Sequence, residues 1–392
     1  MKHFRAWPAS RFGGMALAAF AAVLLLHCGG VGTGGTGGFV SSTITGFGSV
    51  IVGDVEFDDT NAIVLDDDGA VVQRSGNELR LGMTVDVDGS PIVAGASGKH
   101  SSASRVRIST AVQGPIDAVD AVHATLTVLG QQIEVNPATV FGPSLHGGLA
   151  GLGVGDVVAV FARPNAVSGV NQATRIEIAP SAKDYRLRGI VSATNNAQRT
   201  VRVGGVTLDY SNATGVPPDL AIGQLINVRL VAAPGTVLSV EAFSSAIPAP
   251  ADGETAEIEG QVTSFTSDSS FNVNGFAVDA SRARLDVSSA PLGASAHVEV
   301  EGSIVGGTLV ASNVKTFSSS EIDGRIYRVA GPITSLDSAG KTFALRNQVV
   351  DYASATFTNG SAANLAVGVV VHAQGPLSPD GTQIRASLVA IQ

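Results

Sequence analysis

The sequence predicts an all-β protein made of five small antiparallel β-barrels in tandem, joined by short linkers. The first observation is a repeat: an apolar residue, two variable positions, a small residue and then alternating apolar residues. The small residues stand at 82, 155, 223, 295 and 368, which are 73, 68, 72 and 73 residues apart. A period this steady indicates tandem copies of one folding unit. The second observation is composition, with 47 Gly and 15% charged residues, which is typical of short strands and tight turns.

Residues 1–27 read as a signal peptide. Lys2, Arg5 and Arg11 form a positively charged start, and residues 15–26 are an apolar run of 12 residues. A membrane-spanning helix needs roughly 20 residues, so the run is too short to span and has the length of a signal-peptide core.

Cys28, the single cysteine, follows that run closely. The segment Leu25-Leu26-His27-Cys28 resembles the lipobox of bacterial lipoproteins, with His27 where that family has a small residue. The resemblance implies that Cys28 is lipidated and that the protein is held at the outer membrane, since Gly29 rather than Asp comes next. Residues 28–38 are rich in glycine and predict a flexible tether between lipid and folded body. The alternative is an ordinary signal peptide and a secreted or periplasmic soluble protein.

The second copy shows the unit most fully. It has five expected strands, a Gly130-Gln131 turn between the second and third, and a long irregular segment, 136–153, after the third. This order matches the connectivity of an OB-fold barrel, so we expect OB-fold-like units. The first expected strand begins at Gly114, and the other four are expected at 126–129, 132–135, 157–161 and 173–178.

The same reading applied to the other copies places the barrels at 39–110, 111–180, 184–246, 254–318 and 324–392. Pro and Ser at 244–253 and 318–320 predict loose, extended joints. The joint at Thr110-Ala111 is expected to be tight, because the closing strand of the first copy runs directly into the opening strand of the second. We therefore expect an elongated chain of barrels in which neighbours stabilise one another through their interfaces.

The Leu-x-x-Gly-x-x-Val-x-Val element and a closing Ala-x-x-Ile strand, as in Ala386 to Ile391, allow a resemblance to be stated. The units resemble a bacterial domain of unknown function that occurs in tandem in secreted proteins and lipoproteins, over roughly residues 39–392. The resemblance implies a structural role for these residues and transfers no catalytic residue.

Charge and aromatic content exclude one class of partner. The net charge is −9 and aromatic residues are 5%, which disfavours nucleic acid because phosphate binding needs clustered Lys and Arg. The acidic runs Asp58-Asp59 and 66–68 are contiguous, unlike a calcium loop, and are predicted to be solvated hairpin tips. Asp86 and Asp88 alternate with valines and are predicted to face solvent.

No local constellation for catalysis or metal binding stands out. Ser144 and His146 lie in a near match to a nucleophile elbow, but no helix pattern follows them, which favours a loop. Histidines are scattered singly, without the spacing of a zinc site, although distant residues can converge in a fold. We therefore predict no catalytic residue, no metal site and no cofactor. The histidines considered are His100, His123, His146, His297 and His372.

These observations predict a non-enzymatic, envelope-anchored lipoprotein that acts as a binding or spacer module at the outer membrane. Its expected partners are the membrane, through the lipid on Cys28, and an envelope protein or glycan, but not nucleic acid. The first alternative is a carrier of a small ligand such as a glycan, a lipid or a metal ion. The second is a hydrolase, for which Ser144 and His146 are the residues to examine.

Overall fold

The structure is a computed structural model that describes residues 37–72, 78–95, 98–165, 168–179, 183–232, 237–245 and 250–392. The described residues belong to one compact unit, Gly35–Gln392. The predicted signal peptide, Cys28 and all but the last two residues of the predicted tether lie outside them. In the described part of the chain, no helix is long and apolar enough to cross a membrane.

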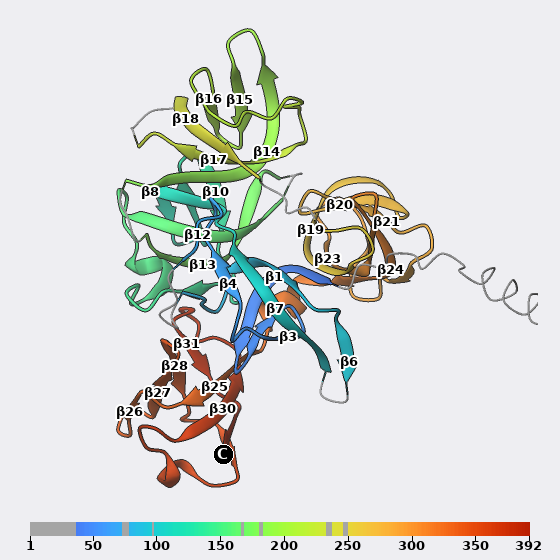
Figure 1. Cartoon of the computed structure of the whole chain (residues 1–392). Coiled ribbons are helices and arrows are strands. Elements are labelled where there is room, and N and C mark those ends of the chain that lie inside the picture. Colours follow the sequence, from blue (N-terminus) through green and yellow to red (C-terminus); the bar gives the residue numbers. More distant parts are fainter. Residues whose placement is uncertain are drawn as a thin grey trace, which may run out of the picture. The chain divides into compact units, whose positions relative to one another are not determined.

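The described residues form five successive β-barrels, called barrels 1 to 5 (Figure 1). Barrel 1 contains β1 (Gly38–Phe47), β2 (Val50–Val52), β3 (Val55–Asp58), β4 (Ile63–Leu65), β5 (Thr84–Gly89), β6 (Val93–Gly95) and β7 (Gly98–Ile108). Barrel 2 contains β8 (Val112–Asp120), β9 (Thr125–Val128), β10 (Gln131–Glu134), β11 (Val140–Phe141), the 3-10 helix η1 (Gly148–Gly151), β12 (Val157–Pro164) and β13 (Val170–Ile178). Barrel 3 contains β14 (Tyr185–Asn195), β15 (Thr200–Val203), β16 (Val206–Asp209), β17 (Leu225–Leu230) and β18 (Val237–Ser244).

The last two barrels follow the same order. Barrel 4 contains β19 (Thr255–Ser267), β20 (Ser270–Val273), β21 (Phe276–Asp279), β22 (Arg284–Asp286), β23 (His297–Val305) and β24 (Thr308–Phe317). Helix α1 (Ser319–Asp323) leads to barrel 5. Barrel 5 contains β25 (Tyr327–Pro332), β26 (Ser335–Asp337), β27 (Thr342–Leu345), β28 (Gln348–Asp351), β29 (Thr356–Thr358), the 3-10 helix η2 (Ala362–Asn364), β30 (Val370–Gly375), β31 (Gln383–Arg385) and β32 (Leu388–Ile391).

The pairing confirms small closed barrels of five main strands and adds one detail. In barrel 2, β8 pairs with β9, β9 with β10, β12 with β13 and β12 with β8, all antiparallel. The ring closes through β10 and β13, which are parallel. Barrels 1, 3 and 4 close in the same way, through β3–β7, β16–β18 and β21–β24. The barrels are therefore not wholly antiparallel as predicted, because the third strand must meet the last one in the same direction.

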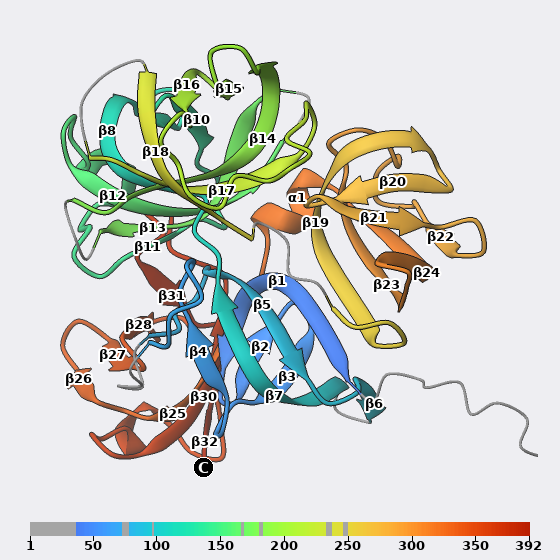
Figure 2. The same ribbon diagram turned by 45° about the horizontal axis from the view of Figure 1, so that its top comes forward.

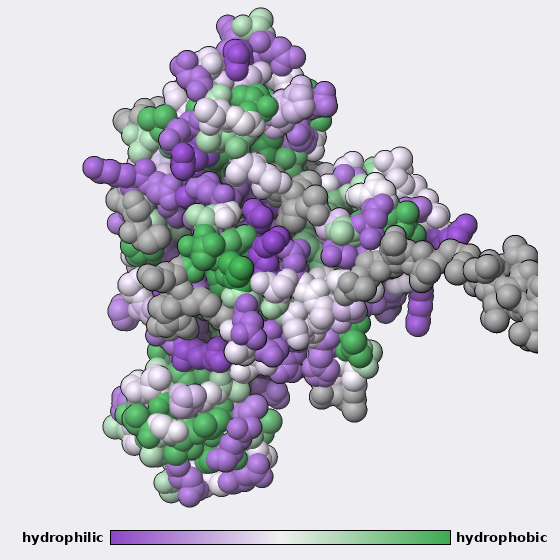
Figure 3. Space-filling model, viewed as in Figure 1, coloured by the Kyte–Doolittle hydropathy of each residue, from purple (hydrophilic) through white to green (hydrophobic). Residues whose placement is uncertain are grey.

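The small residue of the repeat has a conformational reason. Gly82, Gly155, Gly223 and Gly368 have φ of 80°, 91°, 86° and 91°, and Ser295 has φ of 66°. Residues with a Cβ rarely adopt this left-handed backbone, so the position favours glycine. The residue before it is exposed in three copies, with 72% of Val154, 66% of Ile222 and 65% of Val367 accessible. Figure 3 shows hydrophobic residues of this kind interspersed among hydrophilic ones on one face of the molecule.

The first strand of each barrel also joins it to another barrel. β1 pairs in parallel with β19 of barrel 4, Phe39 facing Ala256 in register, and with β25 of barrel 5. β8 of barrel 2 pairs antiparallel with β14 of barrel 3. Figure 2 shows β1 beside β5, its antiparallel partner within barrel 1. The pairing goes beyond the expected contacts between neighbouring barrels, because barrel 1 also pairs with barrels 4 and 5.

The hydrophobic cores follow the same grouping. One core runs through barrels 1 and 5 and includes Val140 and Phe161 of barrel 2, a second runs through barrels 2 and 3, and a third fills barrel 4. Phe39 of β1 is fully buried in the core of barrel 4, where its ring lies 5.6 Å from that of Phe276. A side chain of one barrel thus completes the core of another, which ties their folding together.

The joints differ in stiffness. The expected tight joint exists: β7 ends at Ile108, β8 begins at Val112, and Ala111 donates its N–H to Val160 O at 2.9 Å. The joint at 318–320 is not extended as predicted. Ser318 caps α1, accepting from Glu321 N while its own N–H donates to Glu321 Oε2 at 2.8 Å. The pattern Ser-x-x-Glu at 318–321 is a capping box and could have predicted the helix. The other expected joint, 244–253, lies partly outside the described residues.

Candidate functional sites in a carboxylate ladder and a neutral groove

Strands β19 and β23 of barrel 4 carry polar residues at alternate positions, which places them on one face of the pair. The register opposes Glu257 to Glu301, Glu259 to Glu299 and Gln261 to His297. We call these six residues the carboxylate ladder. Glu257, Glu259 and His297 are buried, with 1%, 3% and 8% of their surface accessible. Barrels 1 and 2 and the segment after α1 contribute the side chains that meet this face.

Glu259 is the centre of the ladder. Its carboxylate accepts from Ser42 Oγ at 2.5 Å, from Arg163 Nη2 at 3.2 Å and from Arg325 Nη2. His297 Nε2 lies 2.8 Å from Glu259 Oε1. Ser42 comes from barrel 1, Arg163 from barrel 2 and Arg325 from the start of barrel 5, so one carboxylate links four barrels.

Electrostatics assign the protonation states around Glu259. Burial opposes its ionisation, but the charges of Arg325 and Arg163 outweigh this and hold the pKa of Glu259 well below its usual range. Burial, together with the charge of Arg163, lowers the pKa of His297 to about 4. His297 is therefore neutral at pH 7, and its Nε2–H donates to the carboxylate. The network is an anion held by two buried cations.

A second group of carboxylates lies at the other end of the ladder. Asp54, Glu257 and Glu299 place one oxygen each within 4.8 Å of one another. Lys99 Nζ lies 2.7 Å from Glu257 Oε2 and 3.1 Å from Asp54 Oδ1, and it also contacts Glu301. Burial and the charge of Glu299 raise the pKa of Glu257 to about 9. Burial and the charge of Asp54 raise the pKa of Glu299 to about 7.

The third site is a groove of about 600 Å³ between barrels 2 and 3. None of its described lining residues is charged or aromatic. Gln132 and Ser192 are exposed on its wall, while Asn171 is 9% exposed and its amide makes no hydrogen bond within the described part of the chain. Gln131 instead donates to Val203 O at 2.9 Å and joins the two barrels. The groove therefore offers neutral hydrogen-bonding groups to a ligand.

The structure places the other residues singled out in the sequence as follows. Ser144 and His146 are both exposed on the loop before η1, on either side of buried Leu145, and neither side chain has a hydrogen-bond partner in the described residues. His372 is exposed, lies 2.6 Å from Gln392 Nε2 and lines a cavity of about 210 Å³ between barrels 1 and 5. His123 is exposed and pairs with Asp120 at 2.7 Å. Among the histidines that the structure describes, only His297 is buried.

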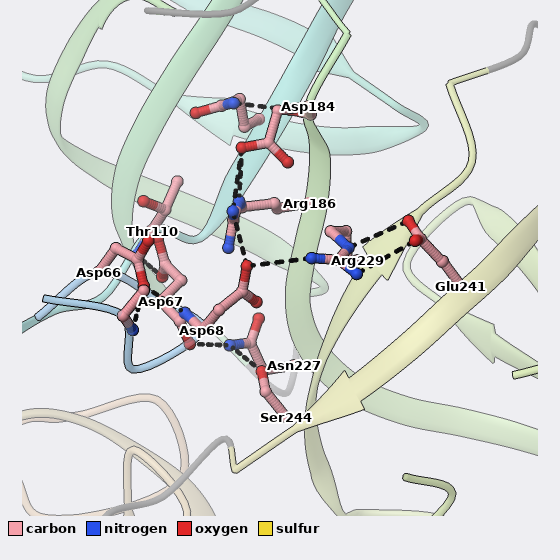
Figure 4. Close-up of polar contacts among 12 residues, drawn as sticks. Asp66, Asp67, Asp68, Thr110, Asp184, Arg186, Asn227, Arg229, Glu241 and Ser244 are labelled. Carbon is pink, nitrogen blue, oxygen red and sulfur yellow. Dashed lines mark hydrogen bonds and ion pairs between the residues drawn. The ribbon is translucent and has the colours of Figure 1, made fainter. Parts of the chain in front are cut away.

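The prediction of solvated acidic tips is right for Asp58 and Asp68, which are exposed, and wrong for Asp67, which is buried. Asp58 is exposed and accepts from Thr60 N at 3.1 Å. Asp67 is 8% exposed and accepts from Thr110 N at 2.6 Å, and its burial raises its pKa to about 6. Asp68 pairs with Arg186 at 2.8 Å and with Arg229 at 3.6 Å (Figure 4). The run thus connects barrel 1 to barrel 3, because those arginines lie on β14 and β17.

Asp86 is a further correction. It is 5% exposed rather than solvent-facing, and burial raises its pKa while the charge of Arg188 opposes that shift. The residue lies on β5 and lines a small cavity together with Arg163 of barrel 2 and Arg188 of barrel 3. Asp88, two residues later, has a side chain that is 36% exposed and pairs with Arg105 at 3.3 Å. The alternation of valine and aspartate correctly predicts that Asp86 lies on the outer face of its barrel, but another barrel covers that face at Asp86.

The repeat can now be compared with known proteins. The model of a family described as a domain of unknown function, DUF5666, matches residues 113–177, 259–315 and 330–390. Three separate segments of the chain thus match one family model. Each DUF5666 match begins in the first strand of a barrel and ends in its closing strand, in barrels 2, 4 and 5. The predicted tandem domain of unknown function is therefore confirmed.

Other comparisons add little to the DUF5666 assignment. No curated protein matches the chain. A solved structure, drosophila Unr CSD456, is 13% identical over 54% of this chain and 98% of that one, with a TM-score of 0.14. A likeness at that TM-score carries no argument about this chain.

Sequence reasoning missed the carboxylate ladder. A signal was present, since Glu257, Glu259 and Gln261 alternate on one expected strand and His297, Glu299 and Glu301 on another. Alternating polar residues on a barrel strand usually indicate its solvated outer face. Three basic residues from other barrels cover this face: Arg163 and Arg325 lie 96 and 66 residues from Glu259, and Lys99 lies 158 residues from Glu257. No local pattern in the sequence relates them to the ladder.

Proposed function

We propose that this chain is a non-enzymatic binding module of the bacterial envelope, anchored at the outer membrane through a lipid on Cys28. The observation that carries the binding role is the neutral groove between barrels 2 and 3. The anchoring role is supported by the signal-peptide pattern of residues 1–27 and by the glycine-rich residues that follow Cys28.

The chemistry of the groove favours a neutral glycan as the ligand. Ligand sites combine a concave surface with a few well-placed polar groups. The amides of Gln132 and Asn171 and the hydroxyls of Thr127 and Ser192 both donate and accept hydrogen bonds, which suits sugar hydroxyls. A charged ligand would find no counter-charge among the described lining residues.

Binding in the groove is tested by thermal shift on residues 39–392 with maltotetraose, cellotetraose and tetra-N-acetylchitotetraose. We expect one of them to stabilise the protein by about 1.4 kcal/mol at ten times its dissociation constant, because it binds only the folded state. Asn171→Ala should abolish the shift. The control is Asn195→Ala, which removes an exposed amide outside the groove on β14. A flat response to all three sugars, from a protein that melts cooperatively, would leave a spacer as the better description.

Anchoring is tested separately by expressing Cys28→Ala in a Gram-negative host. The wild-type protein should sediment with outer membranes, because the lipid on Cys28 carries the anchoring acyl chains. The variant should move to the soluble periplasmic fraction. Cys28→Ser serves as a second variant with a side chain of similar size. Recovery of both variants in the membrane pellet would contradict the anchor.

A further inference from the structure

We propose that Asp54, Glu257 and Glu299 form a calcium site that links barrel 1 to barrel 4. Asp54 lies in the tight turn between β2 and β3, while Glu257 and Glu299 lie on neighbouring strands of barrel 4. Their oxygens come within 4.8 Å of one another although the residues are up to 245 positions apart. This proposal goes beyond the glycan-binding function and does not depend on it.

The first argument is an unsatisfied oxygen. Glu257 is 1% exposed, and its Oε1 has no hydrogen-bond partner among the described residues. That oxygen lies against the turn that carries Asp54, since a Cβ on Gly53 would stand 3.1 Å from it. A buried oxygen without a partner is costly, and its position beside two further carboxylates makes it available as a ligand to a cation.

The second argument is charge balance. Asp54, Glu257, Glu299 and Glu301 share a single basic partner, the ammonium of Lys99, and the raised pKa values of Glu257 and Glu299 mean that protons occupy part of this group at pH 7 when no further cation is bound. Arg163 and Arg325 do not contribute here, because both bind Glu259. A divalent ion would neutralise most of the remaining charge.

The donor set selects the ion. Three carboxylates provide up to six hard oxygen donors, and neither histidine nor cysteine belongs to the group. Calcium takes six to eight oxygen ligands at about 2.3–2.6 Å and tolerates irregular geometry, whereas zinc prefers nitrogen and sulfur. Asp54 is 54% exposed, so water can complete the coordination and the ion can enter from solvent.

Lys99 occupies part of this space and must move. Its side chain is 23% exposed and lies on β7 at the edge of the group, from which the flexible stem can turn toward solvent. The ammonium and the ion therefore compete for the same carboxylates. Removing the ammonium with Lys99→Met should strengthen calcium binding.

The test is isothermal titration of residues 39–392 with CaCl₂ at constant ionic strength, with MgCl₂ as comparison. We expect one calcium per chain with a dissociation constant on the order of 10⁻⁴–10⁻³ M, the range of extracellular calcium modules. Asp54→Asn should weaken binding at least tenfold, and Lys99→Met should tighten it. Asp54 lies in an exposed turn, so the variant should fold, which circular dichroism without calcium will check.

The matched control is Glu56→Gln, which removes a 45% exposed carboxylate from the next strand of barrel 1. It should change calcium affinity less than threefold. No calcium binding up to 10 mM would overturn the proposal and leave Lys99 as the resident cation. Equal affinity for magnesium, or equal loss in the Glu56→Gln and Asp54→Asn variants, would also overturn it.

Discussion

Replacing Glu259 with glutamine should lower the free energy of unfolding by about 3–5 kcal/mol, the cost of breaking a buried ion pair. The carboxylate is 3% exposed and faces Arg163, Arg325 and neutral His297. Glutamine keeps the shape but leaves two buried guanidinium groups without an anion. Urea denaturation followed by circular dichroism measures the effect on the first unfolding transition, since five barrels need not unfold in one step.

The control for this prediction is Glu241→Gln. Glu241 forms a two-point ion pair with Arg229, at 3.0 and 3.1 Å, but its side chain is 53% exposed. An exposed pair of this kind contributes at most about 1 kcal/mol. Equal effects of the two substitutions would contradict the view that Glu259 holds the barrels together.

Gly82→Ala should destabilise the chain by about 2–5 kcal/mol, the sum of a left-handed backbone strain and overpacking. Gly82 has φ of 80°, and a Cβ there would stand 2.5 Å from the backbone oxygen of Thr174 and 2.8 Å from Val140 Cγ2. Both belong to barrel 2, so the methyl group would push barrels 1 and 2 apart. The midpoint of urea denaturation measures the loss.

Gly223→Ala is the matched control, because it changes the same repeat position in barrel 3. Its φ is 86°, but a Cβ there would meet no atom within 4 Å. The expected loss of stability is then only the strain of a left-handed backbone at alanine, about 1–2 kcal/mol. Leu81, 2% exposed, and Ile222, 66% exposed, show the same contrast one residue earlier. A Gly82→Ala effect no larger than that of Gly223→Ala would mean that the contact with barrel 2 adds no stability.

The two predictions differ in how far the sequence anticipates them. Glycine at 82 and 223 follows from the repeat itself, because the turn before the fourth strand needs a positive φ in every copy. That Gly82 also meets barrel 2 follows only from the arrangement of the barrels. Glu259 lies on a strand with polar residues at alternate positions, a pattern that predicts an exposed side chain. In the structure the side chain of Glu259 is buried.

The candidate sites show the same division. The lipid anchor at Cys28 is a prediction from local pattern and lies outside the described residues. The groove and the calcium site instead combine residues from two barrels each, for example Gln132 with Ser192 and Asp54 with Glu299. Ser144 and His146, which stand in one repeat, lie on an exposed loop. The candidate sites are formed between repeats rather than within one.

The sequence by itself determined the repeat, the strand order and the turns of each barrel, because alternation, glycine and chain connectivity act over a few residues. Only the tertiary structure decided which outer faces are buried. Asp67, Asp86 and Glu259 sit on surfaces that a lone barrel would expose, and they are covered because first strands such as β1 pair with other barrels. Such pairing depends on contacts between residues that are 217 positions apart for Gly38 and Thr255 and 282 for Gly46 and Arg328, and no short pattern in the chain predicts them.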